Sequence, residues 1–350
     1  MTAAAGNRDS GAGPAAPPAG PTAGPALLEV TGLSVRAGHR SRSYRVVDDI
    51  SLRLPAGRAL GIVGESGSGK SLTLRALMAL LPPAVWAEEG SITLAGARLP
   101  LTGRGARRTR RRRMAMVFQD SLSALNPVQT VGAQIAEVPR RVLGMGRGAA
   151  WARAIELLDL VGIPSPAARA RSYPHQLSGG MRQRVAIAIA LATRPEVLLC
   201  DEPTTALDVT VQAQVLELIR SLRSQLGFAL IFVSHDIAVV GQVCEEIAVM
   251  YTGRIVETGP VGEVLTSPAH PYTRALLAAV VDLDDGDTPP RPIPGAIPDP
   301  ARLSPGCSFH PRCPLAGPEC TVAPVPLLAV AGAAGERRSA CLHRDLVSQR

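Results

Sequence analysis

With 350 residues, of which 46% are hydrophobic and only 3% aromatic, the chain can bury an aliphatic core large enough for about two domains. No apolar run reaches the roughly 18–20 residues that cross a bilayer, and the N-terminus lacks the pattern of a signal peptide, so we expect a cytosolic chain that reaches a membrane only through a partner. The formal net charge is +8, and much of it comes from the arginines between Arg107 and Arg113, which form either a solvated face or a contact with nucleic acid or an anionic surface.

The first segment of the chain shows no pattern of a helix or a strand. Residues 1–26 are Ala, Gly and Pro without periodicity, and we expect them to be disordered because they bury too little surface to offset the ordering entropy. Alternating apolar residues from Leu27 onward predict strands, and the apolar run Ala59–Val63 is followed by a glycine loop and a predicted helix at Ser71–Leu81. Residues from about 120 to 195 are predicted to be mostly helical.

Strands and helices alternate in the second half. Short apolar runs at Val197–Cys200 and Ala229–Val233 predict strands, and the spacing of Val211–Ser224 between them predicts a helix. This alternation indicates an α/β fold with a parallel sheet covered on both faces. Residues 282–305 are rich in proline, which resists regular structure, and predict a linker or wrapped loop before a cysteine-rich tail.

The segment GESGSGKS at Gly64–Ser71 fits the pattern G-x-x-x-x-G-K-[ST] and lies between a predicted strand and a predicted helix, which is the context that a phosphate-binding loop requires. Its glycines let backbone N–H groups surround an anion, and the helix adds the positive end of its dipole. We expect Lys70 to contact the β- and γ-phosphates of ATP and Ser71 to bind Mg²⁺ through its hydroxyl. The phosphate-binding residues are assigned as Gly64, Ser66, Gly67, Gly69, Lys70 and Ser71.

Two carboxylates end the buried strand VLLCDEP. Ligands bind at the carboxyl ends of strands in such sheets, and adjacent residues point to opposite sides of a strand. Asp201 is therefore expected to face Mg²⁺ or its water shell, and Glu202 to act as the general base that polarises the attacking water.

A third motif, LSGGMRQR at Leu177–Arg184, places a serine and two glycines before a basic helix. This arrangement is either an ordinary capped helix or a second anion site, in which Ser178 is the N-cap and the amides of Gly179 and Gly180 are free to bind.

Taken together and in this order, the three motifs resemble those of ABC-transporter ATPases, and the resemblance covers roughly residues 27–265. It implies an α/β P-loop ABC ATPase with a mixed sheet core, an inserted helical subdomain at about 120–195, and a small Cys-rich C-terminal extension at 266–350. The resemblance also implies roles for four more residues. Tyr44 is similar to the aromatic that stacks on adenine, Gln119 to the glutamine that senses Mg²⁺ and the transmembrane partner, Asp208 to the D-loop aspartate, and His235 to the histidine that contacts the γ-phosphate. The resemblance thus implies that Gln119 and His235 are catalytic residues together with Glu202.

In the family that these motifs resemble, two ATPase domains pair head to tail, so that the phosphate loop of one faces the LSGG of the other across ATP. The sequence contains only one copy each of the phosphate loop, the acidic strand end and the LSGG motif. The resemblance therefore implies a second ATPase subunit. A regulatory subunit with a degenerate site is disfavoured because Glu202 and His235 are both present. A role on nucleic acid is unlikely, since the chain has neither a coiled-coil insertion nor a second ATPase set, and no aromatic stripe accompanies the arginines.

Two further segments resemble the ATPase subunits of dipeptide, oligopeptide and nickel importers, namely FQDSLSALNP at Phe118–Pro127 and SPAHPYTRALLAAV at Ser267–Val280. Such importers have two transmembrane permease subunits, an external substrate-binding protein and usually two different ATPase subunits. The resemblance therefore implies a peripheral subunit at the cytoplasmic face of the cell membrane, which has no direct contact with the substrate. Nickel or another small solute is the alternative cargo.

Four cysteines of the tail follow the spacing C-x₅-C-x₆-C-x₂₀-C. They are suited to a [4Fe–4S] cluster, to Zn²⁺, or to no ligand at all. The tail PGCSFHPRCPLAGPEC also resembles that of peptide-importer ATPases, and this resemblance implies the iron–sulfur cluster, with zinc as the alternative. The four candidate ligands are Cys307, Cys313, Cys320 and Cys341.

Overall fold

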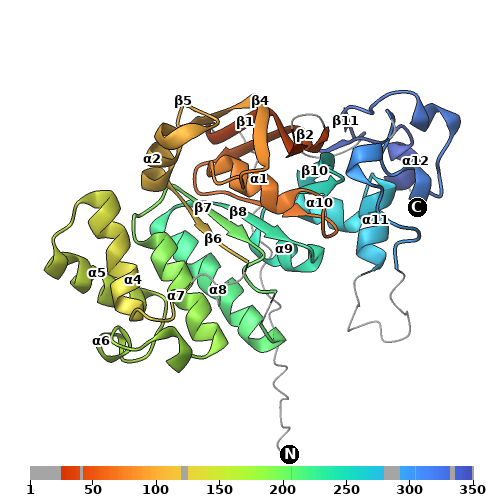
Figure 1. The fold of residues 1–350 in the computed structure, drawn as a ribbon. Helices are drawn as coiled ribbons and strands as arrows, with labels where there is room; N and C mark the ends of the chain where they lie inside the picture. The colour runs from red at the N-terminus through yellow and green to blue at the C-terminus, as the bar shows by residue number, and fades with distance from the viewer. Residues whose placement is uncertain are drawn as a thin grey trace, which may run out of the picture.

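The residues described by the computed structural model of the chain are 25–39, 42–119, 125–205, 207–279, 292–303, 305–331 and 336–348. They form two sheets with helices packed around them (Figure 1). Residues 1–24 of the expected disordered segment, residues 282–291 of the expected linker and residues 120–124 lie outside the described part.

The larger sheet has the strand order β11-β12-β10-β9-β3-β8-β7-β6. The five strands β9, β3, β8, β7 and β6 are mutually parallel, while β10, β12 and β11 extend the sheet beyond β9 with antiparallel pairings. The bounds are β3 Ala59–Val63, β6 Met114–Val117, β7 Val197–Asp201, β8 Ala229–Ser234, β9 Glu246–Tyr251, β10 Arg254–Pro260, β11 Leu328–Ala329 and β12 Arg338–Ser339. The mixed α/β core is thus confirmed.

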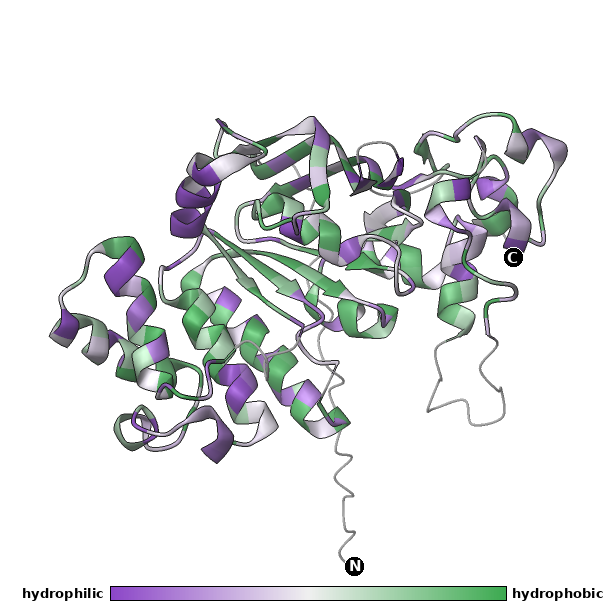
Figure 2. Ribbon diagram, viewed as in Figure 1, coloured by the Kyte–Doolittle hydropathy of each residue, from purple (hydrophilic) through white to green (hydrophobic). Residues whose placement is uncertain are grey.

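The central strands are buried on both faces, because their side chains alternate between two hydrophobic clusters. In β7, Leu198 and Cys200 belong to the cluster shared with the helices of one face, whereas Val197 and Leu199 belong to the cluster of the other face. Figure 2 shows the apolar colour concentrated on these strands and on the sides of the helices that cover them. A continuous apolar run with no polar alternation is what a doubly covered parallel strand requires.

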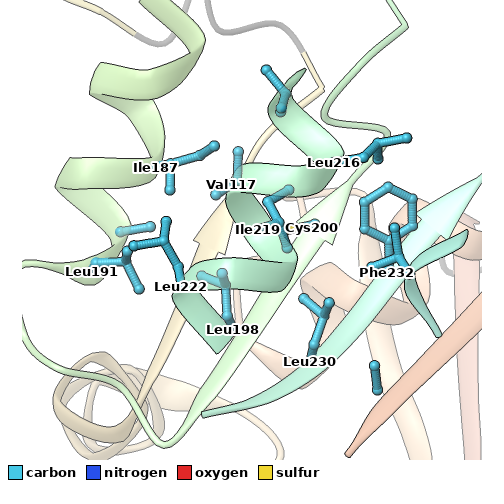
Figure 3. Packing of buried hydrophobic residues seen from close by; sticks show 14 of the residues in the cluster. Val117, Ile187, Leu191, Leu198, Cys200, Leu216, Ile219, Leu222, Leu230 and Phe232 are labelled. Carbon is cyan, nitrogen blue, oxygen red and sulfur yellow. The ribbon is translucent and has the colours of Figure 1, made fainter. Parts of the chain in front are cut away.

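One face of the larger sheet is covered by α7 (Gly179–Leu191), α8 (Val209–Leu226) and α9 (Ile237–Val243). Figure 3 shows this packing, in which Ile187 and Leu191 approach Leu222 and Leu198 at the sheet. The prediction of a helix at Val211–Ser224 is confirmed with a few more residues at each end. Asp208 caps the start of α8, and Gly227, with φ 72°, ends it in the left-handed conformation that glycine adopts readily.

The other face is covered by α1 (Lys70–Leu77) and by the smaller, antiparallel sheet, whose order is β2-β1-β4-β5. Helix α1 ends at Leu77 and not at the predicted Leu81, because Ala79 has a left-handed φ of 55° that a helix cannot continue through. The smaller sheet is formed by β1 Ala26–His39, β2 Arg42–Pro55, β4 Val85–Leu94 and β5 Ala97–Leu99.

The region between β6 and β7 is mostly helical, as predicted. The helices α4 and α5, which precede α7 in this region, pack apolar residues such as Ile135 and Leu157 against α7. Pro139 follows α4 and begins one turn of π-helix, which ends at Gly144 with φ 76°. The elements are α4 Val131–Val138, η1 Pro139–Leu143, α5 Arg147–Leu160, α6 Pro166–Arg169 and η2 Pro174–Gln176.

The arginine run forms most of α2 (Gly103–Arg113), which is the most hydrophilic helix in Figure 2. Five arginines of α2 are exposed: Arg104, Arg107, Arg108, Arg111 and Arg112. Arg113 pairs with Glu196, whose Oε2 accepts from Nη2 at 2.7 Å. Arg110 is buried, has no hydrogen-bond partner among the described residues, and its pKa is lowered to about 10 because burial disfavours the charged guanidinium.

The tail packs against the edge of the larger sheet (Figure 1) and contributes β11 and β12 to it. Phe309 is the apolar anchor of the tail, since it is 1% exposed and lies in the same cluster as Tyr251 and Tyr272. Helix α10 (Val261–Thr266) follows β10, and the remaining elements of the tail are α11 Pro271–Ala278, η3 Pro300–Arg302, η4 His310–Arg312, η5 Pro318–Thr321 and α12 Arg344–Ser348. Across the described residues, no helix is both long enough and apolar enough to span a bilayer.

Candidate nucleotide-binding site

The loop between β3 and α1 has the shape of a phosphate cradle. Gly64 cannot carry a side chain, because a Cβ there would lie 2.1 Å from the carbonyl oxygen of Met250. Gly67 has a φ of 83° and open space around it, so its backbone is free to approach a ligand. Ser68 Oγ is buried in the loop and has no hydrogen-bond partner among the described residues. An unpaired buried hydroxyl beside exposed backbone fits an anion with many acceptor oxygens.

Lys70 lies at the centre of this loop. Its Nζ donates to the carbonyl oxygen of Gly64 at 2.7 Å and to that of Glu65 at 3.1 Å, and the side chain is 4% exposed. Burial lowers the pKa of Lys70, although the carboxylates of Glu202 and Asp201 oppose that effect. A desolvated ammonium held inside a glycine loop is suited to bind the phosphates of a nucleotide as a point charge.

Ser71 and Asp201 lie side by side, as the motifs predict. Ser71 Oγ donates to Asp201 Oδ1 at 2.7 Å, although 130 residues separate them in the chain. Burial raises the pKa of Asp201, and the hydrogen bond from Ser71 opposes this rise. The hydroxyl and the carboxylate are hard oxygen donors at the carboxyl end of β7, and this donor set fits Mg²⁺.

Glu202 is the centre of a polar cluster just past the end of β7. Its Oε2 accepts from Thr205 Oγ1 at 2.9 Å and from Gln119 Nε2 at 3.2 Å, and it lies 3.1 Å from His235 Nδ1. Its Oε1 lies 3.8 Å from Lys70 Nζ. The structure therefore brings together all three residues predicted to be catalytic, Glu202, Gln119 and His235, next to the lysine of the phosphate loop.

The backbone at Glu202 adopts a left-handed conformation, with φ 45°. For a residue with a side chain this conformation costs about 1–3 kcal/mol and persists only where surrounding contacts enforce it. Glu202 N donates to Val233 O at 3.0 Å, so the neighbouring strand β8 fixes the turn. The two carboxylates have different surroundings, since Asp201 bonds to Ser71 whereas Glu202 contacts Gln119, Thr205 and His235.

The LSGG motif lies on the other face of the larger sheet from the phosphate loop. Helix α7 packs in the cluster of α8 and α9, whereas α1 packs in the cluster of the smaller sheet (Figure 1). Ser178 Oγ accepts from Met181 N at 3.3 Å as the N-cap of α7, and the residue is exposed. Gly179 borders Leu207 of the segment before α8, and a Cβ on Gly180 would lie 2.7 Å from Val211 Cγ1.

Two other predicted nucleotide contacts also lie on the surface. Asp208 caps α8 by accepting from Val211 N at 2.9 Å, close to the LSGG segment. Tyr44 is 37% exposed on β2, where it is paired with Ala37 of β1. No hydrogen bond among the described residues joins Tyr44, Ser178 or Asp208 to the phosphate loop.

The tail makes a contact with the phosphate loop that sequence reasoning missed. Glu65, the second residue of the loop, donates its backbone N–H to Tyr272 Oη at 2.7 Å and accepts two hydrogen bonds from Arg312. The sequence signal for this contact is an acid, Glu65, inside a motif that binds an anion. Such an acid needs a compensating cation, but the sequence does not identify which one.

The four tail cysteines line one small cavity together with His270 and Phe309. Cys307 N donates to Cys320 O at 2.8 Å, which ties two of the cysteine-bearing segments together. Burial raises the pKa of Cys313 and raises that of Cys341 to about 12, because it disfavours the charged thiolate.

A tighter group lies beside this cavity. Ligand atoms of Glu319, Cys320 and His343 are within 4.8 Å of one another, and His343 Nε2 is 3.0 Å from Glu319 Oε1. Among the described residues this is the one group of at least three Cys, His, Asp or Glu that is gathered so closely, so three tail cysteines are not within that distance of each other. The four thiols lie around one cavity, which is the arrangement that a common bound metal or cluster would require.

Two protein families match separate parts of the chain. Residues 47–205 match the family described as ABC transporter, and residues 256–320 match the C-terminal region of oligopeptide/dipeptide transporters. A Brucella abortus protein named as a putative peptide import ATP-binding protein is 47% identical over 312 residues, which are 89% of this chain and 94% of that protein. The oligopeptide transport ATP-binding protein OppD of Mycobacterium tuberculosis is 46% identical over 331 residues, which are 93% of this chain and 53% of that protein.

Solved structures resemble about two thirds of the chain. A dimeric ATP-binding cassette in a post-hydrolysis state, bound to ADP and Pi, has a TM-score of 0.60 at 26% identity and covers 67% of this chain and 99% of its own. CbiO1 from Clostridium perfringens, described as part of an ABC transporter complex, has a TM-score of 0.59 at 26% identity and covers 68% of this chain and 90% of its own.

Proposed function

The chain belongs to the family of ABC-transporter ATP-binding proteins, and from this membership we propose that it is the ATP-hydrolysing subunit of an importer for peptides. The observation that carries the proposal is the cluster at the end of β7, in which Glu202 lies between Lys70, Gln119 and His235 while Asp201 bonds to Ser71. These are the groups that phosphoryl transfer to water needs in one place.

Each group has a distinct task in the proposed mechanism. The backbone from Gly64 to Gly69 and the ammonium of Lys70 would hold the phosphates. Ser71 and Asp201 would hold Mg²⁺, which would supply neutralisation of the phosphate charge. Glu202 accepts the proton of the attacking water at its carboxylate. Gln119 and His235 orient this carboxylate through its Oε2.

The nucleotide site is proposed to be completed by a second chain. Ser178, Gly179 and Gly180 are at the surface on the other face of the sheet from the phosphate loop, and Asp208 and Tyr44 are exposed as well. Head-to-tail pairing would bring the LSGG of a second ATPase subunit onto the nucleotide held by this one. The dimeric form of the similar post-hydrolysis cassette supports this arrangement.

Peptide import is supported by the match of residues 256–320 to the oligopeptide/dipeptide transporter C-terminal region and by the names of the Brucella and Mycobacterium relatives. In this proposal the chain binds the cytoplasmic side of two permease subunits, which receive peptide from an external substrate-binding protein. The ATPase subunit itself does not contact the peptide.

The organisation along the chain is part of the same proposal. Residues 27–265 form the ATPase domain, with the helical subdomain at about 120–195, and residues 266–350 form the extension. The cysteines of this extension, Cys307, Cys313, Cys320 and Cys341, are proposed to hold a [4Fe–4S] cluster that fixes a proline-rich tail with few apolar residues. The shared cavity of the four cysteines supports a common ligand.

The proposal is tested by co-expressing the chain with the two permeases and the second ATPase subunit, and by measuring ATP hydrolysis of the purified complex in liposomes. Addition of the binding protein loaded with peptide is expected to stimulate hydrolysis, and the same protein loaded with nickel is expected not to. A chain that fails to co-purify with the permeases, or a complex that responds to nickel and not to peptide, would refute the peptide assignment.

A further inference from the structure

An ion pair joins the phosphate loop to the tail. Arg312 donates from Nη1 to Glu65 Oε2 at 2.7 Å and from Nη2 to Glu65 Oε1 at 3.1 Å, which is the bidentate geometry of strong arginine–carboxylate pairs. The side chain of Arg312 is 3% exposed and that of Glu65 is 22% exposed. Water and salt therefore screen this pair much less than a surface ion pair.

Arg312 is held in this position from several sides. Its Nε donates to Pro294 O at 2.8 Å, Nη2 to Ile293 O at 3.3 Å, and Nη1 to Tyr251 Oη at 3.3 Å. The guanidinium carbon is 5.9 Å from the ring centres of both Tyr251 and Phe309. Most of these partners belong to the tail, so the guanidinium reaches Glu65 only when the tail is docked.

The tail also holds the backbone of the loop. Tyr272 Oη accepts from Glu65 N, and the Tyr272 ring packs 5.4 Å from Phe309 and 4.5 Å from Tyr251, centre to centre. The carbonyl oxygen of Glu65 accepts from Lys70 Nζ. Glu65 therefore connects the tail directly to the lysine that meets the phosphates.

The negative charge of Glu65 affects how tightly the loop can bind phosphates. A carboxylate in a loop that holds a triphosphate repels the ligand unless a cation neutralises it, and the repulsion is strong where water is excluded. Arg312 supplies that neutralisation from outside the loop and keeps the carboxylate turned toward the tail. Loss of Arg312 would both release the loop and leave a negative charge beside the phosphates.

We propose that Arg312 is a positioning residue of the nucleotide site, which holds Glu65 so that the docked C-terminal tail sets the affinity of the phosphate loop for ATP. The inference rests on the proposed nucleotide site at Gly64–Ser71. It makes the tail a regulator of nucleotide binding, because any change that displaces the chain around Cys307 and Cys313 also removes the partner of Glu65.

The test is a double-mutant cycle on the full-length chain, with the dissociation constant of a fluorescent ATP analogue as the first measurement. Arg312→Gln is expected to weaken binding at least about fivefold, the lower end of couplings between linked sites. Arg312→Lys keeps the positive charge but loses the bidentate geometry of the guanidinium. Its dissociation constant for the analogue is expected to lie between those of the wild type and Arg312→Gln. In the Glu65→Gln background, Arg312→Gln is expected to change affinity by less than about twofold, because a residue that acts through a partner has little effect without it.

A second measurement separates positioning from folding. In the assembled complex, Arg312→Gln is expected to raise KM for ATP while kcat at saturating ATP stays close to that of the wild type. The matched control is Arg113→Gln, which removes a bidentate pair with Glu196 away from the loop and is expected to leave both parameters unchanged.

Failure of wild-type protein to bind the analogue would refute the proposed nucleotide site itself. Wild-type binding with an unchanged dissociation constant in Arg312→Gln would overturn only the role of Arg312. Equal losses from Arg312→Gln with and without Glu65→Gln would also overturn it, since the effect would then not pass through Glu65.

Discussion

Replacing Glu202 by Gln removes one charge from the candidate site with little change of shape. The amide oxygen can still accept from Thr205 Oγ1, which lies 2.9 Å from Glu202 Oε2, and the backbone turn held by Val233 O is untouched. The substitution also removes the carboxylate 3.8 Å from Lys70 Nζ, which competes with phosphate for that ammonium. We therefore expect ATP to bind at least as tightly to the variant as to the wild type.

Hydrolysis should respond very differently. An amide cannot accept a proton from water at neutral pH, and loss of a general base lowers the rate by a factor of about 10²–10⁴. This factor corresponds to about 3–5 kcal/mol of barrier height, at 1.36 kcal/mol for each tenfold change. The assay is phosphate release by the assembled complex at saturating ATP, together with the dissociation constant of nucleotide for the variant. A variant that retains more than about a tenth of wild-type turnover would refute the role of Glu202 as general base.

Three further predictions concern the second anion site, the loop and the tail. Ser178→Arg is expected to lower hydrolysis by the assembled complex by about 10²-fold, the effect of losing one transition-state donor, while ATP binding by the isolated chain stays unchanged; weakened binding in the isolated chain would show that Ser178 meets its own nucleotide. Gly64→Ala is expected to destabilise the fold by about 1–3 kcal/mol in urea unfolding, because the new Cβ would lie 2.1 Å from Met250 O; wild-type stability would contradict the close approach. Anaerobically purified protein is expected to contain about four irons per chain and to lose them in Cys313→Ser but not in the control Cys244→Ser, whereas a colourless protein that contains zinc would contradict the cluster.

The sequence was sufficient for the residues whose chemistry depends on short spacings. Gly64–Ser71 and the pair Asp201 and Glu202 could be assigned because a loop, a strand end and a helix start each need particular residues in succession. The family resemblance indicated roles for Gln119 and His235, but their meeting at one oxygen of Glu202 is seen only in the structure. The left-handed turn at Glu202 that makes this meeting possible carries no sequence signal, because a glutamate is not expected at positive φ.

The tail was the least predictable part of the fold. Strands β11 and β12 have two residues each, too few to show any periodicity, and they form only because the edge of β10 offers unpaired backbone groups. Arg312 lies 247 residues from Glu65, and in a chain rich in arginine nothing local distinguishes it from the others. Long-range pairing of this kind depends on how the tail docks against the ATPase domain. Phe309 takes part in this docking through its packing in the core cluster.

The central claim is that ATP hydrolysis by this chain drives peptide into the cell, and peptide uptake into proteoliposomes tests it most directly. Complexes with wild-type chain or with Glu202→Gln are reconstituted with ATP on the side of the ATPase subunits and labelled peptide with its binding protein on the other side. We predict ATP-dependent accumulation of peptide with the wild type and none with Glu202→Gln. Equal accumulation in both, or none in either while the wild type hydrolyses ATP, would contradict the account.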